Sequence, residues 1–279
     1  MKKARIIGVD LGGTNLRAAI VQEGAAGKIG SRPLAAQQDK EEVLAQIFDS
    51  INRFFDKDVA AIGIGVPGLV DPVSKTVYDV VNVPALNGLH LQSILERRYG
   101  VPVKAENDAN CFALGEFHSG NRQHAGSLIG LAIGTGLGAG IVLDGKLYSG
   151  RHGGAGEFGM MKYLDRNIEY YVSGRFFEHV FGVAGETAYA EAIAGNVKAV
   201  GMYETFGRHL GEAIKMILYA LDISCIVIGG SLRAAFPLYE KSMWETVNSF
   251  EYARALANLE ITPSVLDNGN ILGAAALHF

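Results

Sequence analysis

The sequence predicts an α/β protein made of two halves that repeat one order of elements. Apolar runs typical of strands alternate with apolar residues at helical spacing, in the order βββαβαβ over the first half. From residue 127 this order begins again, which indicates an internal duplication. A glycine-rich turn follows the first strand of each half, at 11–14 and at 134–138. With 279 residues, 49% of them hydrophobic, the chain can bury a large core in one or two domains.

The first half contains both strand and helix patterns. Residues 60–66 form a continuous apolar run, typical of a strand buried on both faces, and Pro67 and Gly68 end it. A loop with a hairpin is expected within residues 71–84. The expected strands are residues 5–10, 15–22, 28–35, 60–66 and a short one from Val101, and the expected helices are residues 40–55 and 89–99.

The second half opens with an uncharged stretch, residues 125–143, that could be mistaken for a membrane span. Its six glycines and two turn-like centres favour two strands instead. Asp144-Gly145 is a strong hairpin signal after the second of these strands. The expected strands are residues 127–133, 139–143, 146–148, 225–228 and 259–265, and the expected helices are residues 174–181, 187–194, 200–221, 236–249 and 271–277.

Composition narrows the class of protein. The net charge of −4 argues against a nucleic-acid-binding surface. Cys111 and Cys225 are the only cysteines, and each stands in an apolar stretch, as expected for buried thiols in a reducing compartment. Charged residues come too early at the N-terminus for a signal peptide. We therefore expect a soluble, cytoplasmic protein with neither nucleic acid nor membrane as a partner.

A polar corner at residues 101–116 is the first candidate for chemistry. A short strand is followed by Asn107 and Asp108, which are both good helix N-caps, and then by a helical stretch. The corner places a carboxylate at the C-terminal end of a strand, where open α/β sheets bind ligands. Taken alone, Asp108 reads more readily as a helix cap than as a catalytic group.

Two glycine motifs resemble nucleotide-binding signatures but fail on their surroundings. Gly63, Gly65 and Gly68 match a dinucleotide fingerprint, yet prolines at 67 and 72 deny the helix that must follow. Residues 140–147 are one residue from a P-loop, but Leu147 stands where a hydroxyl should hold Mg²⁺. The seven histidines and two cysteines show no metal-ligand spacing.

Three other glycine-rich turns follow strands and are better candidates for binding a nucleotide. Glycines let backbone N–H groups approach a phosphate without interference from a Cβ. The turn after the first strand also offers Asp10 as a water-mediated Mg²⁺ ligand and Thr14 as a phosphate donor. The candidate residues are Asp10, Gly12, Gly13, Thr14 and Asn15 in the first turn, Gly134, Thr135, Gly136 and Gly138 in the second, and Gly229, Gly230 and Ser231 in the third, where a flat adenine could rest.

These turns together carry a resemblance. The ordered set resembles the superfamily of sugar kinases, actin and heat-shock ATPases. Within it, Asn82-Val-Pro, Asn107-Asp108-Ala-Asn110 and Gly156-Glu157-Phe-Gly159 are similar to motifs of the ROK family of sugar kinases and repressors. The resemblance covers nearly the whole chain. It implies a two-domain RNase H-like (actin-like ATPase) duplication with an interdomain cleft.

The resemblance also implies roles for individual residues. Asp108 matches the catalytic base that takes the proton of the attacking sugar hydroxyl. Glu157 and Glu169 match two sugar-binding carboxylates. The other residues that match sugar-binding positions are Gly68, Asn82 and Asn107. Taken alone, Glu157 could be a surface carboxylate in a glycine loop and Glu169 a solvated residue at a helix start.

One departure from the family concerns zinc. The family's Gly-Glu-x-Gly-His motif has Met160 in place of the histidine, and the cysteine cluster that should follow is absent. We therefore expect no structural zinc. Met160 cannot make the sugar contact that the histidine makes in the family, which bears on the choice of sugar and, to a smaller extent, on the activity.

The resemblance implies an ATP- and Mg²⁺-dependent kinase for a hexose or N-acetylhexosamine, glucokinase-like, working as a homodimer. We expect residues 1–108 with a C-terminal helix at 267–279 as one domain, and residues 109–266 as the other. Two alternatives remain open, a sugar-sensing transcriptional regulator and a catalytically inactive sugar-binding protein. The first expected strand begins within a few residues of Met1, which leaves no room for a helix-turn-helix. The presence of Asp108 argues against an inactive protein.

Overall fold

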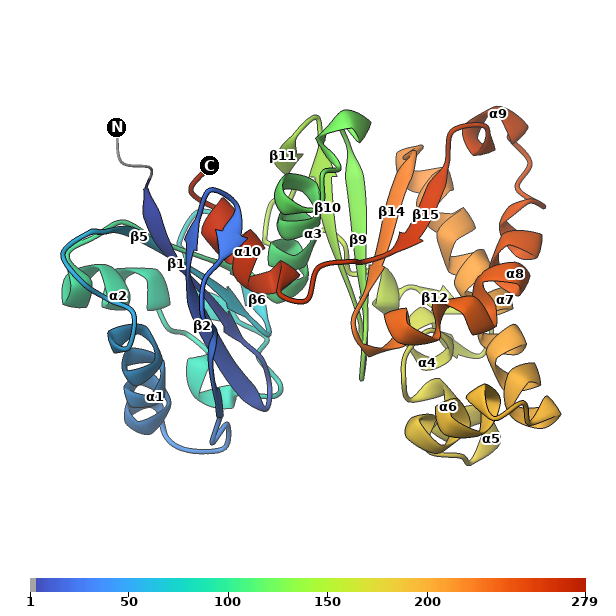
Figure 1. Cartoon of the computed structure of the whole chain (residues 1–279), viewed down its shortest axis with the longest axis horizontal. Helices are drawn as coiled ribbons and strands as arrows, with labels where there is room; N and C mark the ends of the chain where they lie inside the picture. Colours follow the sequence, from blue (N-terminus) through green and yellow to red (C-terminus); the bar gives the residue numbers. More distant parts are fainter. Residues whose placement is uncertain (1–3) are drawn as a thin grey trace. The chain divides into compact units, whose positions relative to one another are not determined.

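The computed structural model describes residues 4–279 and has a mixed α/β architecture with two main sheets (Figure 1). The chain divides into two compact units. The first comprises residues up to Gly126, together with Gly140–Ala155 and Val265–Phe279. The second comprises Ser127–Ala139 and Gly156–Ser264.

The main sheet of the first unit has the order β3-β2-β1-β5-β8, with β4 also paired to β2. β1 pairs antiparallel with β2 and parallel with β5, which pairs parallel with β8. The strands are β1 (Arg5–Leu11), β2 (Asn15–Gln22), β3 (Ala25–Ala26), β4 (Gly30–Pro33), β5 (Val59–Val66) and β8 (Val103–Asn107). A separate two-stranded hairpin, β6 (Leu69–Val70) and β7 (Val77–Tyr78), is the hairpin expected within the loop after β5.

The helices of the first unit cover both faces of this sheet. They are α1 (Lys40–Asn52), η1 (Pro84–Leu86), α2 (Leu91–Tyr99), α3 (Asp108–Ser119), η2 (Gln123–Ala125) and α10 (Gly269–Ala276). Side chains alternate along β1, so that Ile7 and Val9 join the core under α1 and α2. Ile6 points the other way and packs against Ile271 and Leu272 of α10. Figure 1 shows α1 and α2 on one side of the strands and α10 on the other.

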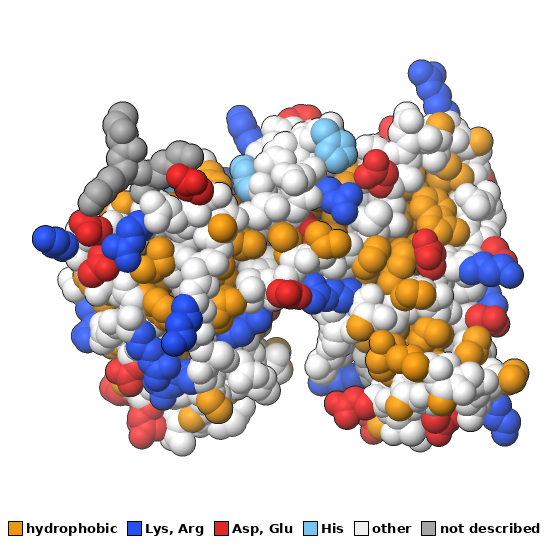
Figure 2. Space-filling view, in the orientation of Figure 1, with side chains coloured by type: hydrophobic (Ala, Val, Ile, Leu, Met, Phe, Trp, Pro, Cys, Tyr) orange, Lys and Arg blue, Asp and Glu red, His pale blue; other side chains and the backbone are white. Residues whose placement is uncertain are grey.

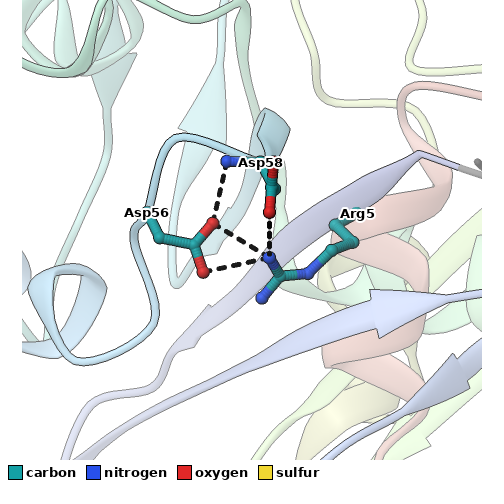
Figure 3. A network of polar contacts seen from close by, with 3 residues as sticks. All are labelled: Arg5, Asp56 and Asp58. Atoms are coloured by element: carbon teal, nitrogen blue, oxygen red, sulfur yellow. Dashed lines mark hydrogen bonds and ion pairs between the residues drawn. The ribbon is translucent and has the colours of Figure 1, made fainter.

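A surface ion-pair network fixes the start of β1 (Figure 3). The Arg5 guanidinium lies 2.9 Å from Asp56 Oδ1 and 3.9 Å from Asp58 Oδ2, in the loop that leads into β5. The register between β1 and β5 shifts at Arg5 and Ile6. Because the pair is solvated, it contributes little free energy and mainly fixes the orientation of the loop.

The second sheet has the order β11-β10-β9-β14-β15. Its strands are β9 (Leu128–Ile133), β10 (Leu137–Leu143), β11 (Lys146–Leu147), β14 (Cys225–Gly229) and β15 (Glu260–Pro263). β14 pairs parallel with both β9 and β15. The turn between β10 and β11 has positive φ at Asp144 and Gly145, as the Asp-Gly signal predicted.

The second unit is otherwise mostly helical. Its elements are η3 (Phe158–Met160), α4 (Ile168–Tyr171), α5 (Phe176–Phe181), α6 (Gly185–Ile193), α7 (Val197–Leu221), η4 (Ser231–Ala235), α8 (Phe236–Val247) and α9 (Ala253–Leu256), with a small hairpin of β12 (Lys162–Tyr163) and β13 (Arg166–Asn167). Buried aromatic rings of α5, α7 and α8 form its core, with Phe177 4.5 Å from Tyr203 and Phe206 5.1 Å from Tyr239 between ring centroids.

Most of the expected elements are present. The uncharged stretch at 125–143 forms two strands, β9 and β10, and none of the helices described over residues 4–279 is long and apolar enough to cross a membrane. Two expectations were wrong in detail. Residues 28–35 form only the four-residue strand β4, and the segment 162–171 holds a hairpin and a helical turn that the sequence did not indicate.

The compact units divide the chain differently from the domain boundary expected at residue 108. Helix α3 lies in the first unit because it packs tightly on α10. A Cβ on Gly115 would lie 2.0 Å from the Gly269 carbonyl oxygen, and one on Gly273 would lie 1.6 Å from that of Cys111. Glycine at both positions lets the two backbones touch.

Figure 2 shows acidic and basic side chains interspersed over the face that it displays. This mixture agrees with the small net charge of −4. Both cysteines, Cys111 and Cys225, are buried, and they form no disulfide. Burial raises the pKa of the Cys111 thiol well above its ordinary value, so this thiol is unreactive.

Candidate active site

Asp108 begins α3 directly after β8, and the helix cap is its neighbour. The Asn107 side chain accepts hydrogen bonds from the N–H groups of Ala109 at 2.9 Å and Asn110 at 3.1 Å. Asp108 is the first helical residue, and its Oδ1 accepts from the Ala109 N–H at 2.8 Å. Since Asn107 already serves as the N-cap, helix capping does not by itself account for a carboxylate at 108.

Parallel pairing brings the ends of three strands together at this corner. Asp10 of β1 stands opposite Gly65 of β5, and Val66 stands opposite Asn107 of β8. The Asn107 side chain also donates to the Gly68 carbonyl oxygen at 3.0 Å. Gly68 and Asn107, two of the residues expected at a sugar site, are therefore in direct contact.

Glu106 is a residue of this corner that the sequence did not single out. One carboxylate oxygen accepts from the Asn107 N–H at 2.9 Å and from the Asn110 side chain at 3.1 Å. The other accepts from the Ser149 hydroxyl at 3.0 Å. These bonds fix the start of α3 and the loop after β11. Only the folded structure shows them, because Ser149 lies 43 residues away.

The first glycine turn connects β1 and β2 as a tight hairpin. The Gly12 N–H donates to the Asn15 carbonyl oxygen at 2.9 Å, and Asn15 Nδ2 donates to the Thr14 hydroxyl at 3.2 Å. A Cβ on Gly13 would lie 3.0 Å from the Cβ of Asn82. The structure therefore places Asn82, expected at the sugar, against the turn expected at the nucleotide.

Asp10, the expected Mg²⁺ ligand, is buried and already carries partners. Its Oδ2 accepts from the Arg17 guanidinium at 2.6 Å, and its Oδ1 accepts from Asn270 of α10 at 3.3 Å. Because the hydrogen bond to Oδ1 is long, this oxygen can still accept a hydrogen bond from a water molecule. This donor set fits the water-mediated role expected for Asp10 better than direct ligation, which would have to displace Arg17.

Two carboxylates lie near one another in the second unit. Glu157 directly precedes the turn η3, and Glu169 is the second residue of α4. The protein packed around the Glu157 carboxyl raises its pKa above the ordinary value of 4.5, and the negative charge of Glu169 adds to the shift. Paired acceptors of this kind suit a ligand with several hydroxyl groups.

The second glycine turn is bonded to α4 and to the residues that follow it. Within the turn, the Gly134 N–H donates to the Gly136 carbonyl oxygen at 2.9 Å. The Leu137 N–H donates to Glu169 Oε2, also at 2.9 Å, and the Gly174 N–H donates to the Gly134 carbonyl oxygen at 2.7 Å. Gly138 lies in β10 beyond this turn.

The third glycine turn borders a cavity of about 370 Å³ in the second unit. Gly230 has φ of 75°, and a Cβ there would lie 2.2 Å from the Ile133 carbonyl oxygen, so only glycine fits between β14 and β9. Gly134, Thr135 and Ser231 line the cavity, whereas Gly229 ends β14 beside it. The structure thus brings the second and third turns together, as a nucleotide site requires.

The cavity has further lining residues that the sequence did not reveal, among them Arg175, Glu178 and Tyr189. They come from α5, its cap and α6, and a short helical pattern gives no sign of which side chains face a cavity. In the sequence, the Ser-Gly pair at 173–174 is the one sign of this part of the cavity. The Gly174 N–H donates to the Gly134 carbonyl oxygen.

The segment after Met160 is held by aromatic contacts. The Tyr163 hydroxyl lies 3.0 Å from His209 Nδ1 of α7, and Tyr171 lies 4.8 Å from the His209 ring between centroids. Met160 itself is 56% exposed. Over the described residues 4–279, no group of three or more His, Cys, Asp or Glu side chains could hold a metal ion.

Comparison with known proteins identifies the family of this chain. The sequence profile of the ROK family matches residues 6–279. The chain belongs to the ROK family. The mixed α/β architecture expected from the sequence is confirmed, and its fold is the actin-like ATPase fold of the ROK sugar kinases.

Relatives within the ROK family are similar over nearly their whole length. An N-acetyl-D-glucosamine kinase of Vibrio parahaemolyticus is 32% identical, over 97% of this chain and 98% of the relative. One of Haemophilus influenzae is 34% identical over 84% of this chain and 86% of the relative. A ROK glucokinase from Streptomyces griseus, solved with glucose and AMPPNP, has a TM-score of 0.80 at 26% identity and covers 98% of this chain and 99% of its own.

Proposed function

We propose that this protein is an ATP-dependent sugar kinase that phosphorylates N-acetyl-D-glucosamine or a closely related hexose. The observation that carries the proposal is the carboxylate of Asp108, which directly follows the parallel strand β8 and begins α3. The N-cap of α3 is Asn107, so Asp108 is not needed for that role. The names and coverage of the ROK relatives support the same activity.

Asp108 is the general base in this proposal. It accepts the proton of the sugar hydroxyl as that hydroxyl attacks the terminal phosphate. The positive end of the α3 dipole favours a negative charge at this position. Glu106 and Asn107 hold the start of α3, so the base is fixed in position before substrate arrives.

Glu157 and Glu169 accept hydrogen bonds from sugar hydroxyls, and Gly68, Asn82 and Asn107 contribute to the sugar pocket. Backbone N–H groups of the first two glycine turns hold the nucleotide phosphates, and the third turn borders the site of the base. The cavity of about 370 Å³ is of the size that a base and its ribose need.

Asp10 would hold Mg²⁺ through water beside the first turn. When bound, the ion neutralises charge on the phosphates during transfer. The burial of Asp10, its ion pair with Arg17 and its bond to Asn270 keep this carboxylate in one orientation.

We also propose that the protein works in the cytoplasm as a homodimer, with the sugar and ATP as its small-molecule partners. Its use of ATP and its two buried cysteines, which form no disulfide, support a reducing compartment. Size-exclusion chromatography with light scattering tests the dimer.

A panel of sugars tests the activity. The purified protein is assayed with ATP and Mg²⁺ against N-acetyl-D-glucosamine, N-acetyl-D-mannosamine, glucose and mannose. We expect phosphorylation with the highest kcat/KM for N-acetyl-D-glucosamine. A protein that binds these sugars but transfers no phosphate to any of them would contradict the proposal and favour a sugar-binding protein without catalysis.

A further inference from the structure

We propose that Glu169 couples sugar binding to nucleotide binding, because one carboxylate serves both the sugar and the backbone of the second glycine turn. The inference rests on the proposed kinase function, in which the turn at 134–138 holds phosphate and Glu169 accepts a sugar hydroxyl. Every contact that carries it lies within the second unit.

The contact between Glu169 and the turn is direct and tight. Glu169 Oε2 accepts the Leu137 N–H at 2.9 Å. A Cβ on Gly136 would lie 2.6 Å from the same oxygen, so the carboxylate reaches the backbone only because residue 136 is glycine. Gly159 allows a second close approach, since a Cβ there would lie 2.9 Å from the Leu137 carbonyl oxygen and 3.4 Å from Glu169 Cβ.

The segment that carries Glu169 is fixed at both ends. Asn167 caps α4 by accepting from the Tyr170 N–H at 3.0 Å. Gly174 donates to the Gly134 carbonyl oxygen at 2.7 Å. Residues 169–174 therefore hold the turn at Gly134 and again at Leu137, and a shift of the Glu169 carboxylate shifts the turn.

The second carboxylate oxygen is the one available to the sugar. Oε1 lies farther from the turn, 3.8 Å from the position of a Cβ on Gly136, compared with 2.6 Å for Oε2. Repulsion between Glu157 and Glu169 contributes to the raised pKa of Glu157. Hydroxyl donors shared between the two carboxylates would relieve that repulsion and hold Glu169 in the orientation that bonds Leu137.

Coupling follows from this shared carboxylate. A bound sugar fixes Glu169, and Glu169 holds the Leu137 N–H, which fixes the neighbouring N–H groups of the turn for phosphate. The nucleotide binds a turn that is already ordered, so its affinity rises, and by linkage the nucleotide raises sugar affinity by the same factor. Glu169 is thus a positioning residue for the nucleotide as well as a sugar ligand.

The test measures this factor by calorimetry. A non-hydrolysable ATP analogue with Mg²⁺ is titrated into the protein, with and without saturating N-acetyl-D-glucosamine or the best sugar of the panel. For the wild type we expect the sugar to tighten nucleotide binding by about 5–150-fold, the usual range for coupled sites. In Glu169→Ala the factor should fall to about one, because sugar and turn no longer share a group.

Glu157→Ala is the matched control. It also removes a sugar carboxylate, but the Leu137 N–H of the turn donates to Glu169, and within residues 4–279 Glu157 accepts no hydrogen bond from the turn. Coupling at saturating sugar should therefore remain. Glu169→Gln gives a second reading if Glu169→Ala does not fold. Its amide oxygen can still accept from Leu137, but its NH₂ can only donate to a sugar hydroxyl oxygen, so the charge-assisted bond from the sugar is lost and the coupling factor should fall well below the wild-type value.

The outcomes separate the two proposals. Coupling that persists in folded Glu169→Ala or Glu169→Gln overturns the inference and leaves the kinase function standing, as does equal loss of coupling in Glu157→Ala. A wild-type protein that phosphorylates the sugar but binds nucleotide equally well with and without it also overturns the inference alone. A wild-type protein that neither binds nor phosphorylates any sugar overturns both.

Discussion

At the scale of single residues, the corner at the end of β8 separates two roles that one side chain could have filled. Asn107 caps α3 and holds Gly68, and Asp108 follows it as the first helical residue. A capping role would make Asp108 a structural residue, whereas the base role needs its ability to accept a proton. Substitution at each position tells these roles apart.

Asp108→Asn should remove catalysis without unfolding the protein. The amide cannot take a proton, so kcat should fall by roughly 10²–10⁴-fold, the usual scale for loss of a general base. The melting temperature should stay close to wild type because Asn107 remains the cap. Steady-state kinetics and a thermal melt measure both quantities. A stable variant with nearly normal kcat would falsify the assignment and direct attention to Glu157.

Asn107→Ala is the control for this prediction. It removes the cap and the bond to Gly68, and should lower the free energy of unfolding by about 1 kcal/mol or more. If Asp108 were the cap, Asp108→Ala would carry this cost in stability and Asn107→Ala would not, whereas Asp108→Asn would stay stable because Asn caps helices about as well as Asp.

Glu157 should make sugar affinity depend on pH, in a pH range above that in which a glutamate ordinarily titrates. Burial and the charge of Glu169 raise its pKa above 4.5. As pH falls through that raised pKa, the carboxyl takes a proton and loses acceptor capacity, so sugar affinity should weaken before an ordinary glutamate would titrate. The measurement is the sugar Kd against pH without nucleotide, which leaves the proton transfer to Asp108 out of the readout.

The variant Glu157→Gln should bind sugar more weakly and lose this pH dependence. The same shift has a consequence for stability. A raised folded-state pKa means that the folded protein holds the proton more tightly than the unfolded chain, so this group destabilises the fold as pH rises. An unchanged pH dependence in Glu157→Gln would assign the titration to another group.

At the scale of elements, glycines decide how the last helix packs. Three glycines of β1, β5 and α3 and one of α10 itself meet backbone atoms at distances that exclude a Cβ: Gly8, Gly63, Gly115 and Gly273. Gly63 belongs to the false dinucleotide fingerprint, so that motif's first glycine is explained by α10, whose Ala274 carbonyl oxygen would lie 1.7 Å from a Cβ on it. Gly140, in the false P-loop, makes room for α3 in the same way.

Gly273→Ala should therefore destabilise the first unit. The added Cβ would lie 1.6 Å from the Cys111 carbonyl oxygen, and α10 must move to accommodate it. We expect a loss of about 1–3 kcal/mol in the free energy of unfolding, the usual cost of overpacking. Gly201→Ala in α7 is the matched control, because its Cβ meets open space and alanine is the better helix former by about 1 kcal/mol. Denaturant titration compares them, and equal stability of the two variants would contradict this account.

The sequence predicted those elements whose own pattern specifies them. Strands β2 and β5 and helices α1 and α7 lie within a few residues of their expected bounds, because periodicity and turn residues act locally. The hairpin β12–β13 and the turn α4 were not expected, because the contacts that hold them come from His209, about forty residues away on α7. The same limit applies to the site, where Glu106 was missed because its partner Ser149 is distant in the chain, and the cavity residues because they come from separate helices. Arg17 is only seven residues from Asp10, and its ion pair depends on the pairing of β1 with β2.

The roles of Asp108, Glu157 and Glu169 were inferred from the family resemblance and remain predictions. What the structure adds is their surroundings: the cap beside Asp108, the charge between the two glutamates, and the bond from Glu169 to Leu137. A motif identifies a carboxylate, but only the fold shows which backbone groups that carboxylate also holds.

At the scale of the whole molecule, the duplicated order of elements has been adapted differently in the two compact units. The first unit encloses its sheet between helices on both faces, and the last helix of the chain completes it. The second unit devotes most of its length to helices around an aromatic core. Helix α3 belongs to the same compact unit as α10 because the two helices pack closely. The boundary between the units therefore does not fall at the polar corner, where it was expected from the sequence.

The last prediction concerns metals. In the segment after Met160, the hydrogen bond between Tyr163 and His209 and the ring contacts with Tyr171 hold the hairpin and α4 against α7. A structural zinc would contribute a large share of the folding free energy, about 10–16 kcal/mol in zinc-finger peptides. Its removal would therefore lower the melting temperature strongly. We expect dialysis against EDTA to leave the melting temperature unchanged and to abolish sugar phosphorylation. Mg²⁺ alone should restore turnover, because the phosphates of ATP need a hard cation. One tightly held zinc per chain by elemental analysis, or a melting temperature that falls with EDTA and recovers with Zn²⁺, would show that the aromatic contacts are insufficient.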